Sequence, residues 1–363
     1  MTMQAPAAPF RLGTRQLIEH VATRDWAAST RLDFELKKVG YLAGLLVRVT
    51  GTWTVGAATP DERPGFPYNI VRQFVLNVPG LAHPVQLSGY QAKLQMLAGR
   101  PFAMHSQGFD RVASAIVGQA NAHHDADLDD QAVITTGGAR DVDLWFYIST
   151  TRNARDLRGL LPIGGDQDTM FEVHCGALGD IFDATAQITA TDLDVELYQV
   201  FYTPPVAGFS APDVSWAVVY DEYTQAITAT GDVNIEIPRD GVILNVIHAL
   251  WIDDDLFPAA PEASIESLSL RVNRDRLLDG LPYVAWAKLQ AMRADRPFPA
   301  GVIVYDFDYN AADLPFVEAG QERGTDWLLT QGVTEIESRI RVAAAATLDS
   351  AKVVTSVKRL MRI

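Results

Sequence analysis

The sequence predicts an all-β fold with a few short helices, in which two similar β-sandwich domains are fused in one chain. Three observations support this prediction. The tetrapeptide Ala-Lys-Leu-Gln occurs at 92–95 and again at 287–290, each time followed closely by Arg-Pro-Phe. Alternation of apolar and polar residues with period two, typical of strands, is the commonest pattern. Gly and Pro turns interrupt these runs at short intervals, which favours sandwiches over a doubly wound sheet.

The two tetrapeptides lie 195 residues apart in a chain of 363 residues, so the repeat has the size of a domain. A further matched pair, near Phe171 and Ile336, is too weak to count. Several longer blocks recur in the same order in both halves, which predicts a duplicated domain. They are Phe34-Glu35-Leu36 before Gly40 and Ile235-Glu236-Ile237 before Gly241, the apolar runs 41–49 and 242–252, the alternating stretches 74–78 and 268–272, and the helical stretches 87–97 and 281–292.

The predicted domain limits follow from these blocks and from a Pro-rich break between them. We expect an N-terminal helical arm at 1–30, a first domain at 31–202, a linker at 203–208 and a second domain at 209–363.

Two further segments carry structural expectations. A helix is expected at 109–119, and the Asp-rich stretch 122–143 is expected to form a long surface loop. The arm is expected to be helical because its apolar residues stand near helical spacing. These residues are Leu17, Ile18, Val21 and Trp26.

The composition and the apolar pattern limit the kinds of protein that the sequence can encode. Hydrophobic residues make up 48% of the chain, which is enough for two cores. The sequence contains no apolar run of about 18 residues, so no membrane-spanning segment is expected. Residues 1–10 lack a basic start and an apolar core, so we expect no secretory signal. Cys175 is the only cysteine, which excludes an intrachain disulfide.

The net charge of −15 is unevenly distributed. Residues 1–31 carry a net charge of +2 and residues 348–363 a net charge of +3, so the body between these ends is acidic. An acidic body argues against direct binding of nucleic acid, which requires a basic face. The basic ends could contact an anionic lipid surface or could simply be solvated, and both interpretations stay open.

Motifs for catalysis and cofactor binding are absent from the sequence. It has no Gly-rich phosphate loop, no His-Glu-x-x-His, no Cys-x-x-Cys and no Gly-x-Ser-x-Gly. Its seven His residues do not form the His-x-His pattern of a two-cupin metalloenzyme. We therefore expect no enzyme activity, no catalytic residues and no cofactor.

An acidic run within 122–143 offers weak candidates for calcium binding. Asp125, Asp127 and Asp129 match the first three ligand positions of an EF-hand loop. The sixth position, normally Gly, is Asp130, and the twelfth, normally Glu, is Thr136. The match to an EF-hand therefore fails, and a solvated acidic loop is the competing interpretation.

A second acidic pair lies near a predicted strand. Asp306 and Asp308 would point to one face of that strand, roughly 6.5–7 Å apart. This separation fits the carboxylate pair of an inverting glycosidase. The competing interpretation is ordinary sandwich patterning, with the Asp residues facing solvent and their aromatic neighbours facing the core.

The repeated order of blocks resembles the major capsid proteins that contain two fused jelly rolls, especially those of tectivirus-like, internal-membrane-containing icosahedral phages. The resemblance covers most of 31–363, and its motifs are structural. The residues that carry it are Phe34-Glu35-Leu36 with Gly40 and 45–49, the stretch 74–78 with Leu87-Ser88-Gly89-Tyr90, their second-copy equivalents at 235–241 and 268–273, and, near the C-terminus, 301–307, Asp326-Trp327 and Val333-Thr334-Glu335.

The resemblance implies two fused jelly-roll β-sandwiches and a viral coat protein of the virion, assembled in the host cytoplasm. Three such chains would form a pseudo-hexameric homotrimer that tiles an icosahedral shell around an internal membrane. Its partners would be neighbouring capsid trimers, vertex and minor capsid proteins and the membrane surface. The family has no active-site residues to carry over. The candidates for facing the membrane are Arg11, Arg15, Leu17, Ile18, Val21, Arg24 and Trp26.

Two other classes of protein fit the pattern. A two-domain β-sandwich carbohydrate-binding protein or glycoside hydrolase is the main alternative, and it would depend on Asp306 and Asp308. A cellular adhesion or scaffold protein is the third, although such a protein would usually carry a signal peptide.

Overall fold

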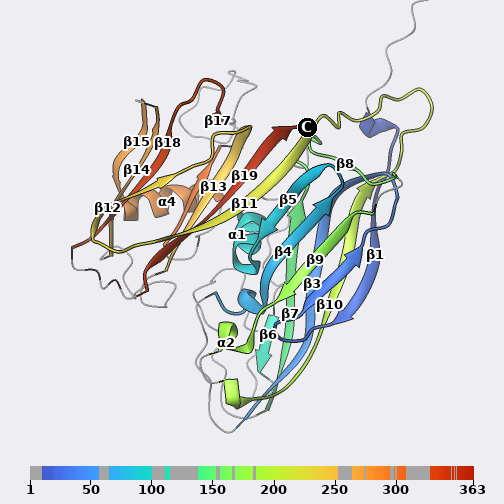
Figure 1. The fold of residues 1–363 in the computed structure, drawn as a ribbon, viewed down its shortest axis with the longest axis horizontal. Helices are drawn as coiled ribbons and strands as arrows, with labels where there is room; N and C mark the ends of the chain where they lie inside the picture. The colour runs from blue at the N-terminus through green and yellow to red at the C-terminus, as the bar shows by residue number, and fades with distance from the viewer. Residues whose placement is uncertain are drawn as a thin grey trace, which may run out of the picture.

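The chain forms two β-sandwiches, one from each half of the sequence (Figure 1). Strands dominate, as the sequence predicts, and helices are few and short. The computed structural model describes residues 10–56, 65–99, 111–114, 138–152, 156–165, 168–182, 185–251, 264–273, 275–294, 298, 301–307, 328–344, 346, 348 and 350–363.

The first sandwich, called the first roll below, consists of two antiparallel sheets. One sheet has the strand order β1-β10-β3-β7-β6, with β8 beside β3, and the other contains β5-β4-β9-β2. The strands are β1 (Gln16–Asp25), β2 (Arg31–Glu35), β3 (Tyr41–Val55), β4 (Val71–Val78), β5 (Leu81–Leu87), β6 (Arg111–Ser114), β7 (Gly138–Ser149), β8 (Leu161–Pro162), β9 (Met170–Cys175) and β10 (Ile188–Tyr202).

The second sandwich, the second roll, repeats this arrangement. Its sheets have the orders β16-β13-β19-β11, with β17 beside β13, and β12-β18-β14-β15. Two sheets of four strands in this order form a jelly roll, so the fold is a double jelly roll. The strands are β11 (Trp216–Ala226), β12 (Gly231–Glu236), β13 (Val242–Trp251), β14 (Ile265–Val272), β15 (Asp275–Pro282), β16 (Val302–Asp306), β17 (Leu328–Leu329), β18 (Ile336–Val342) and β19 (Lys352–Arg362).

The duplication extends to a backbone irregularity. Where β3 pairs with β10, the register skips Ala43, and where β13 pairs with β19, it skips Leu244. Each skipped residue is the third after a glycine with positive φ, Gly40 or Gly241. A bulge adds local twist to a strand and is usually retained among related structures. The same bulge at the same place confirms that the two rolls are copies of one unit.

Helices connect or cover the sheets. Helix α1 follows β5, and α4 follows β15, as the repeated helical stretches predict. The Ser88 hydroxyl accepts a hydrogen bond from the backbone N–H of Gln91, which caps the start of α1. The helices are η1 (Phe10–Leu12), η2 (Tyr68–Ile70), α1 (Gly89–Gly99), α2 (Leu178–Ile181), η3 (Thr185–Gln187) and α4 (Tyr283–Ala294).

The N-terminal arm was predicted to be helical, and this prediction is wrong for residues 16–25. Residues 16–25 form β1, which pairs antiparallel with β10 at the edge of the first roll. The register shifts between His20 and Ala22, so Val21 lies in a bulge. The bulge breaks the period-two pattern of the strand, and the remaining spacing of Leu17, Ile18 and Val21 imitates that of a helix.

Two other expectations also change. Part of the helix expected at 109–119 is the strand β6, which pairs with β7. The loop expected at 122–143 ends by residue 138, because β7 begins there. Residues 122–137 lie outside the described part of the chain.

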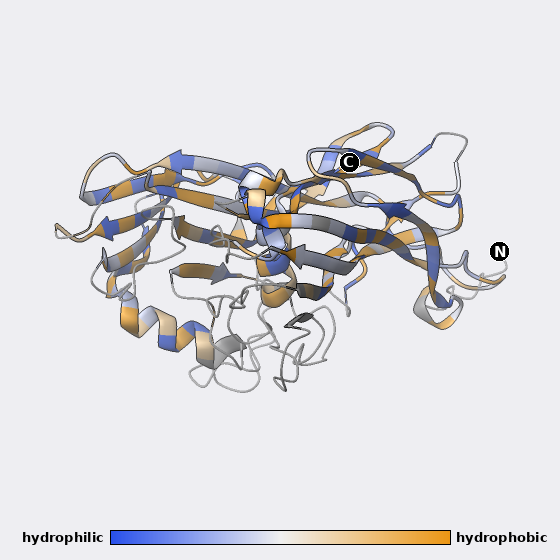
Figure 2. Ribbon diagram, turned by 90° about the horizontal axis from the view of Figure 1, so that it is seen from below, coloured by the Kyte–Doolittle hydropathy of each residue, from blue (hydrophilic) through white to orange (hydrophobic). Residues whose placement is uncertain are grey.

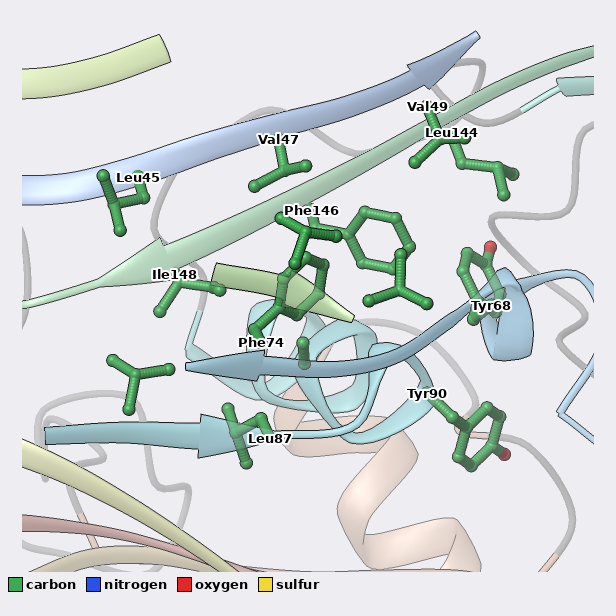
Figure 3. Packing of buried hydrophobic residues seen from close by; sticks show 14 of the residues in the cluster. Leu45, Val47, Val49, Tyr68, Phe74, Leu87, Tyr90, Leu144, Phe146 and Ile148 are labelled. Carbon is green, nitrogen blue, oxygen red and sulfur yellow. The ribbon is translucent and has the colours of Figure 1, made fainter. Parts of the chain in front are cut away.

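The core of the first roll lies between its two sheets. Along β3, Leu45, Val47 and Val49 are fully buried, because alternate residues of a strand point to one face. Figure 3 shows these side chains and Phe146 facing Phe74 of the opposite sheet. The rings of Phe74 and Phe146 lie 5.2 Å apart in an edge-to-face arrangement. Figure 2 shows the same alternation of hydrophilic and hydrophobic residues along many strands.

Within the sheet β16-β13-β19-β11, strand β13 is buried on both faces. Every residue of β13 except Trp251 is buried. One face, with Ile243, Val246 and Leu250, belongs to the core of the second roll. The other face, with Leu244 and Ile247, packs into the hydrophobic cluster of the first roll. The two rolls therefore share an apolar interior across their junction.

Candidate functional site

The junction between the rolls is the most elaborate polar site in the described part of the chain. Strand β5 of the first roll runs parallel to β11 of the second, with Val85 opposite Tyr220. Both residues are buried, and the Tyr220 hydroxyl donates a hydrogen bond of 2.9 Å to the carbonyl of Ser149. This pairing joins β5-β4-β9-β2 to β11-β19-β13-β16 in one continuous sheet, which has nine strands when β17 beside β13 is included.

Helix α1 of the first roll presents buried amides to β19 of the second roll. Gln91 donates from Nε2 to the carbonyl of Val354 at 3.0 Å and accepts from the Ser356 hydroxyl at 2.7 Å. Gln95 donates from Nε2 to the Ser356 hydroxyl oxygen at 2.9 Å. Buried polar groups are stabilising only when they are hydrogen-bonded, so this network fixes one relative position of the two rolls.

Charged groups reinforce the same junction. A carboxylate oxygen of Glu222 on β11 accepts the backbone N–H of Ser88 at 2.6 Å, just before α1 begins. Burial raises the pKa of Glu222, and the hydrogen bond from Ser88 opposes that shift. On β19, Lys358 donates from Nζ to the carbonyl of Arg152 at 2.8 Å, and its ammonium lies 5.7 Å from the Tyr220 ring centre.

The basic C-terminal stretch is therefore partly structural. Lys358 and Arg359 are only 5% and 6% exposed. The Arg359 guanidinium contacts the carboxylates of Asp221 and Asp240, and burial lowers its pKa. Lys358 and Arg359 bind groups within the chain. The net charge of +3 counted for residues 348–363 therefore overstates the positive charge that this end could present to a lipid surface.

Sequence reasoning did not single out these junction residues. A signal was present, because Gln95 and Gln290 end the two copies of the repeated tetrapeptide and both are buried. Their partners nevertheless lie in different places. Gln95 contacts Ser356 across the junction, whereas Gln290 binds β16 within the second roll. No local pattern encodes the partner of either side chain.

The candidates for facing a membrane occupy different environments. Trp26 is buried and donates from Nε1 to the carbonyl of Ile70, so it does not face a membrane. Val21 is half-buried against the core of the first roll. The exposed candidates are Arg15, Leu17, Ile18 and Arg24, while the side chain of Arg11 lies outside the described part of the chain.

Only one of the acidic candidates, Asp306, lies in the described part of the chain. Asp306 ends β16, and Asp308 lies outside the described residues, as do Asp125, Asp127 and Asp129. Within the described ranges, no three His, Cys, Asp or Glu side chains are grouped closely enough to hold a metal ion. None of the helices described here has the length and apolar character needed to cross a bilayer.

No protein-family model matches the chain. No curated protein matches it in sequence either. Its fold, however, is similar to those of solved capsid proteins over nearly the whole chain. The STIV MCP, from Sulfolobus turreted icosahedral virus, has a TM-score of 0.67 at 11% identity, and the similarity covers 96% of this chain and 97% of that one.

Two further solved structures extend the comparison. VP54 of PBCV-1 has a TM-score of 0.62 at 10% identity, with 96% and 94% of the two chains covered. The major capsid protein P2 of bacteriophage PM2 has a TM-score of 0.54 at 10% identity, with 95% and 98% covered. This chain has the double-jelly-roll fold of viral major capsid proteins. At sequence identities of 10–11%, the similarity between this chain and the solved structures concerns the fold alone.

Proposed function

We propose that the chain is a viral major capsid protein and that it resides in the virion. One observation carries this proposal. The similarity to the STIV MCP extends over 96% of this chain and 97% of that protein, so no domain of either lacks a counterpart in the other. The similar structures come from a Sulfolobus virus, PBCV-1 and a bacteriophage, so they support a capsid role without singling out a phage host.

The proposed assembly unit is a homotrimer. Two similar rolls in each chain give a trimer six nearly equivalent lobes, and such a pseudo-hexagon can tile a facet with similar contacts on every side. The proposed shell is icosahedral, assembled in the host cytoplasm, and its trimers contact neighbouring trimers and the vertex and minor capsid proteins. The duplicated topology and the shared bulge support the near-equivalence of the lobes.

An internal membrane beneath the shell is a separate part of the proposal. Exposed Arg15 and Arg24 support it, because cations attract anionic headgroups. The burial of Trp26, Lys358 and Arg359 reduces the surface available for such a contact. Co-flotation of the purified chain with anionic vesicles tests this part, and loss of flotation in Arg15→Ala/Arg24→Ala is the expected result.

The carbohydrate-active alternative gains no support from the described residues. It requires Asp306 and Asp308 as a pair, and only Asp306 lies within the described structure, at the end of β16. The structural similarity to capsid proteins favours the capsid proposal over this alternative.

Native mass measurement and negative-stain imaging of the purified chain test the capsid proposal. A trimer of about 120 kDa, three times the 39.7 kDa of the chain, with a six-lobed outline is expected. A chain that stays monomeric at all accessible concentrations and salt conditions contradicts the trimer. Loss of sugar-polymer hydrolysis in Asp306→Asn, if the wild-type chain has such activity, would contradict the capsid role itself.

A further inference from the structure

A buried histidine distinguishes the core of the second roll from that of the first. The shared bulge aligns β3 with β13, so His248 of β13 holds the place of Val47 of β3. The pairing registers extend this match, because Val47 pairs with Leu197 and His248 pairs with Thr355. All four side chains are buried. The second roll therefore carries polar groups at core positions where the first roll has aliphatic ones.

These polar groups form a row across the inner face of one sheet. Nδ1 of His248 lies 2.8 Å from the Thr355 hydroxyl oxygen, and Thr355 pairs with Tyr223 of β11. The Tyr223 hydroxyl donates a hydrogen bond of 2.9 Å to the carbonyl of Glu236 on the opposite sheet. The Tyr305 ring of β16 lies 5.6 Å from the imidazole in an edge-to-face arrangement. The row thus crosses the second roll from β16 to β12.

The surroundings of His248 favour a neutral imidazole. In the described structure its Nε2 is buried and has no hydrogen-bond partner. Burial lowers the pKa of His248 to about 3, and no charged group among the described residues contributes to that shift. Burial without a compensating charge disfavours the charged form of any ionisable group. The imidazole therefore stays neutral for as long as the second roll is closed.

The titratable side chains around this histidine are phenols. Tyr305 on β16, Tyr223 on β11 and Tyr283 on α4 all pack into the same core. Phenols carry no charge at pH 7 and below, and burial raises the pKa of Tyr305 to about 12. These three side chains therefore cannot balance a proton on the imidazole.

The charged groups on this face of the sheet are paired with one another. Arg359 lies four positions beyond Thr355 on β19 and contacts the carboxylates of Asp221 and Asp240. Strand β18 of the opposite sheet turns apolar residues and Ser338 towards the core, and its charged residues alternate with these and face outward. Within the described core, no carboxylate is thus in place to hold an imidazolium.

The first roll has no equivalent group in its described part. His20 and His83 are exposed, and His174 is half-buried beside Glu172. The hydrogen bond with His174 lowers the pKa of Glu172 from its ordinary value of 4.5. Because this carboxylate takes up a proton more readily in the unfolded chain, its contribution to stability is present above pH 4.5 and is lost only as the pH falls below that value.

The interior of the second roll and the junction between the rolls respond to acid in opposite directions. At His248 the unfolded chain, with a histidine pKa of about 6.5, takes up a proton before the folded chain does, so stability declines as the pH falls below that value. At Glu222, burial raises the pKa, so the folded chain takes up the proton first and stability grows as the pH falls. The carboxylate of Glu222 accepts the backbone N–H of Ser88 at the junction. Mild acid therefore weakens the interior of the second roll and maintains its junction with the first.

We propose that the second roll is an acid-sensitive element of this chain, in which the strands around His248 open in mild acid while the first roll and the β5–β11 junction stay closed. Opening brings the imidazole into water, where its protonated form is solvated. The roll cannot close again over a charged imidazole for which the core offers no partner. In a shell built from such chains, one roll of each chain would respond to an acidic compartment. The inference goes beyond the capsid proposal and does not depend on it.

Hydrogen–deuterium exchange of the full chain, read by mass spectrometry and corrected for the intrinsic effect of pH, tests the proposal. Between about pH 7 and about pH 5, the opening constant reported by peptides of β13 and β19 is expected to rise on the order of 30-fold, because a histidine that is protonated only when exposed changes this constant about tenfold per pH unit below 6.5. Peptides of β3, β10 and β5 are expected to keep their protection. Equal acceleration in both rolls overturns the proposal.

His248→Gln is expected to abolish the acid response of β13 and β19, because glutamine can bond to Thr355 and takes up no proton. His20→Gln, at an exposed histidine of the first roll, is the matched control and should leave the response unchanged. A response of wild-type size in His248→Gln overturns the proposal.

Two further measurements cover a variant that fails to fold. His248→Val/Thr355→Leu copies the corresponding pair of the first roll, Val47 and Leu197, and is also expected to lose the response. In the wild-type chain, exchange of β13 should begin to accelerate near pH 6.5, whereas an onset only below about 4.5 assigns the effect to carboxylates and overturns the proposal. Assemblies that dissociate near pH 5 without faster exchange in β13 place the acid response between chains, which overturns this inference and leaves the proposed function standing.

Discussion

The amide of Gln290 closes the open edge of β16, and replacing it with leucine tests how much the second roll depends on that cap. Gln290 donates from Nε2 to the carbonyl of Val302 at 2.8 Å and accepts from the backbone N–H of Val304 at 3.1 Å. Both valines lie on β16, whose other edge pairs with β13. The side chain thus takes the place of a neighbouring strand, and it is only 4% exposed.

Gln290→Leu removes both hydrogen bonds and leaves two buried backbone groups without partners. Each such group costs about 1–3 kcal/mol, so the free energy of unfolding should fall by about 2–5 kcal/mol after the gain from burying leucine is subtracted. At about 2–4 °C per kcal/mol for a domain of this size, the melting temperature of the second roll should fall by on the order of 10 °C.

Gln95→Leu is the matched control, because Gln95 holds the same place in the other copy of the tetrapeptide. It makes a single hydrogen bond, to Ser356, and its Oε1 is buried without a partner. Ser356 keeps its bond to Gln91 in the variant, so the expected loss is within about 1 kcal/mol.

Differential scanning calorimetry of the two purified variants measures both effects. Fluorescence of Trp286, whose ring lies 5.3 Å from that of Tyr305, helps to assign the transition of the second roll. Equal shifts in Gln290→Leu and Gln95→Leu would refute the reasoning, because they would show that the edge cap contributes no more than the junction amide.

Three further predictions concern stability. Trp53→Ala should lower the free energy of unfolding by about 3–5 kcal/mol in urea titrations, because the side chain is fully buried among aromatic rings, and a small effect would contradict this packing. Burial lowers the pKa of His248 to about 3, so the unfolded chain, with a histidine pKa of about 6.5, binds a proton at a higher pH than the folded chain does. Stability should therefore decline as the pH falls from about 6.5 towards 3, by up to ~1.4 kcal/mol per pH unit, and this slope should shrink in His248→Gln. Gly40→Ala and Gly241→Ala should each cost about 1–3 kcal/mol, because φ is positive and a Cβ would collide with a carbonyl oxygen, whereas Gly80→Ala, with positive φ but open space, should cost less in the same thermal scans.

The sequence alone predicted the main architecture. Recurring blocks around Gly40 and Gly241 indicated the duplication, and both glycines mark the start of matching strands and bulges. The repeated helical stretches are α1 and α4. The weak pair near Phe171 and Ile336 was set aside, yet it marks the equivalent strands β9 and β18. Short strands with few shared residue types leave little sequence signal even when their positions correspond.

The N-terminal strand could not be recognised from its residues. Leu17, Ile18 and Val21 fit a helix because the bulge at Val21 shifts the period of β1. What makes the segment a strand is its pairing with β10, which lies more than 160 residues away in the chain. Tertiary pairing overrides local periodicity when an edge strand gains backbone hydrogen bonds.

Alternation, turns and repetition by themselves determined that this chain forms two like sandwiches, since these features are local and recur along the sequence. Only the tertiary structure decided which copy of each repeated element is covered. Gln95 is buried where α1 meets β19 of the second roll, and Leu94 is buried in the hydrophobic cluster of the first roll. Leu289, the counterpart of Leu94 in the second copy of the tetrapeptide, remains exposed. Gln95 meets Ser356, which lies 261 positions away in the chain. Burial of that kind depends on how the assembled sheets pack, and no short sequence pattern contains it.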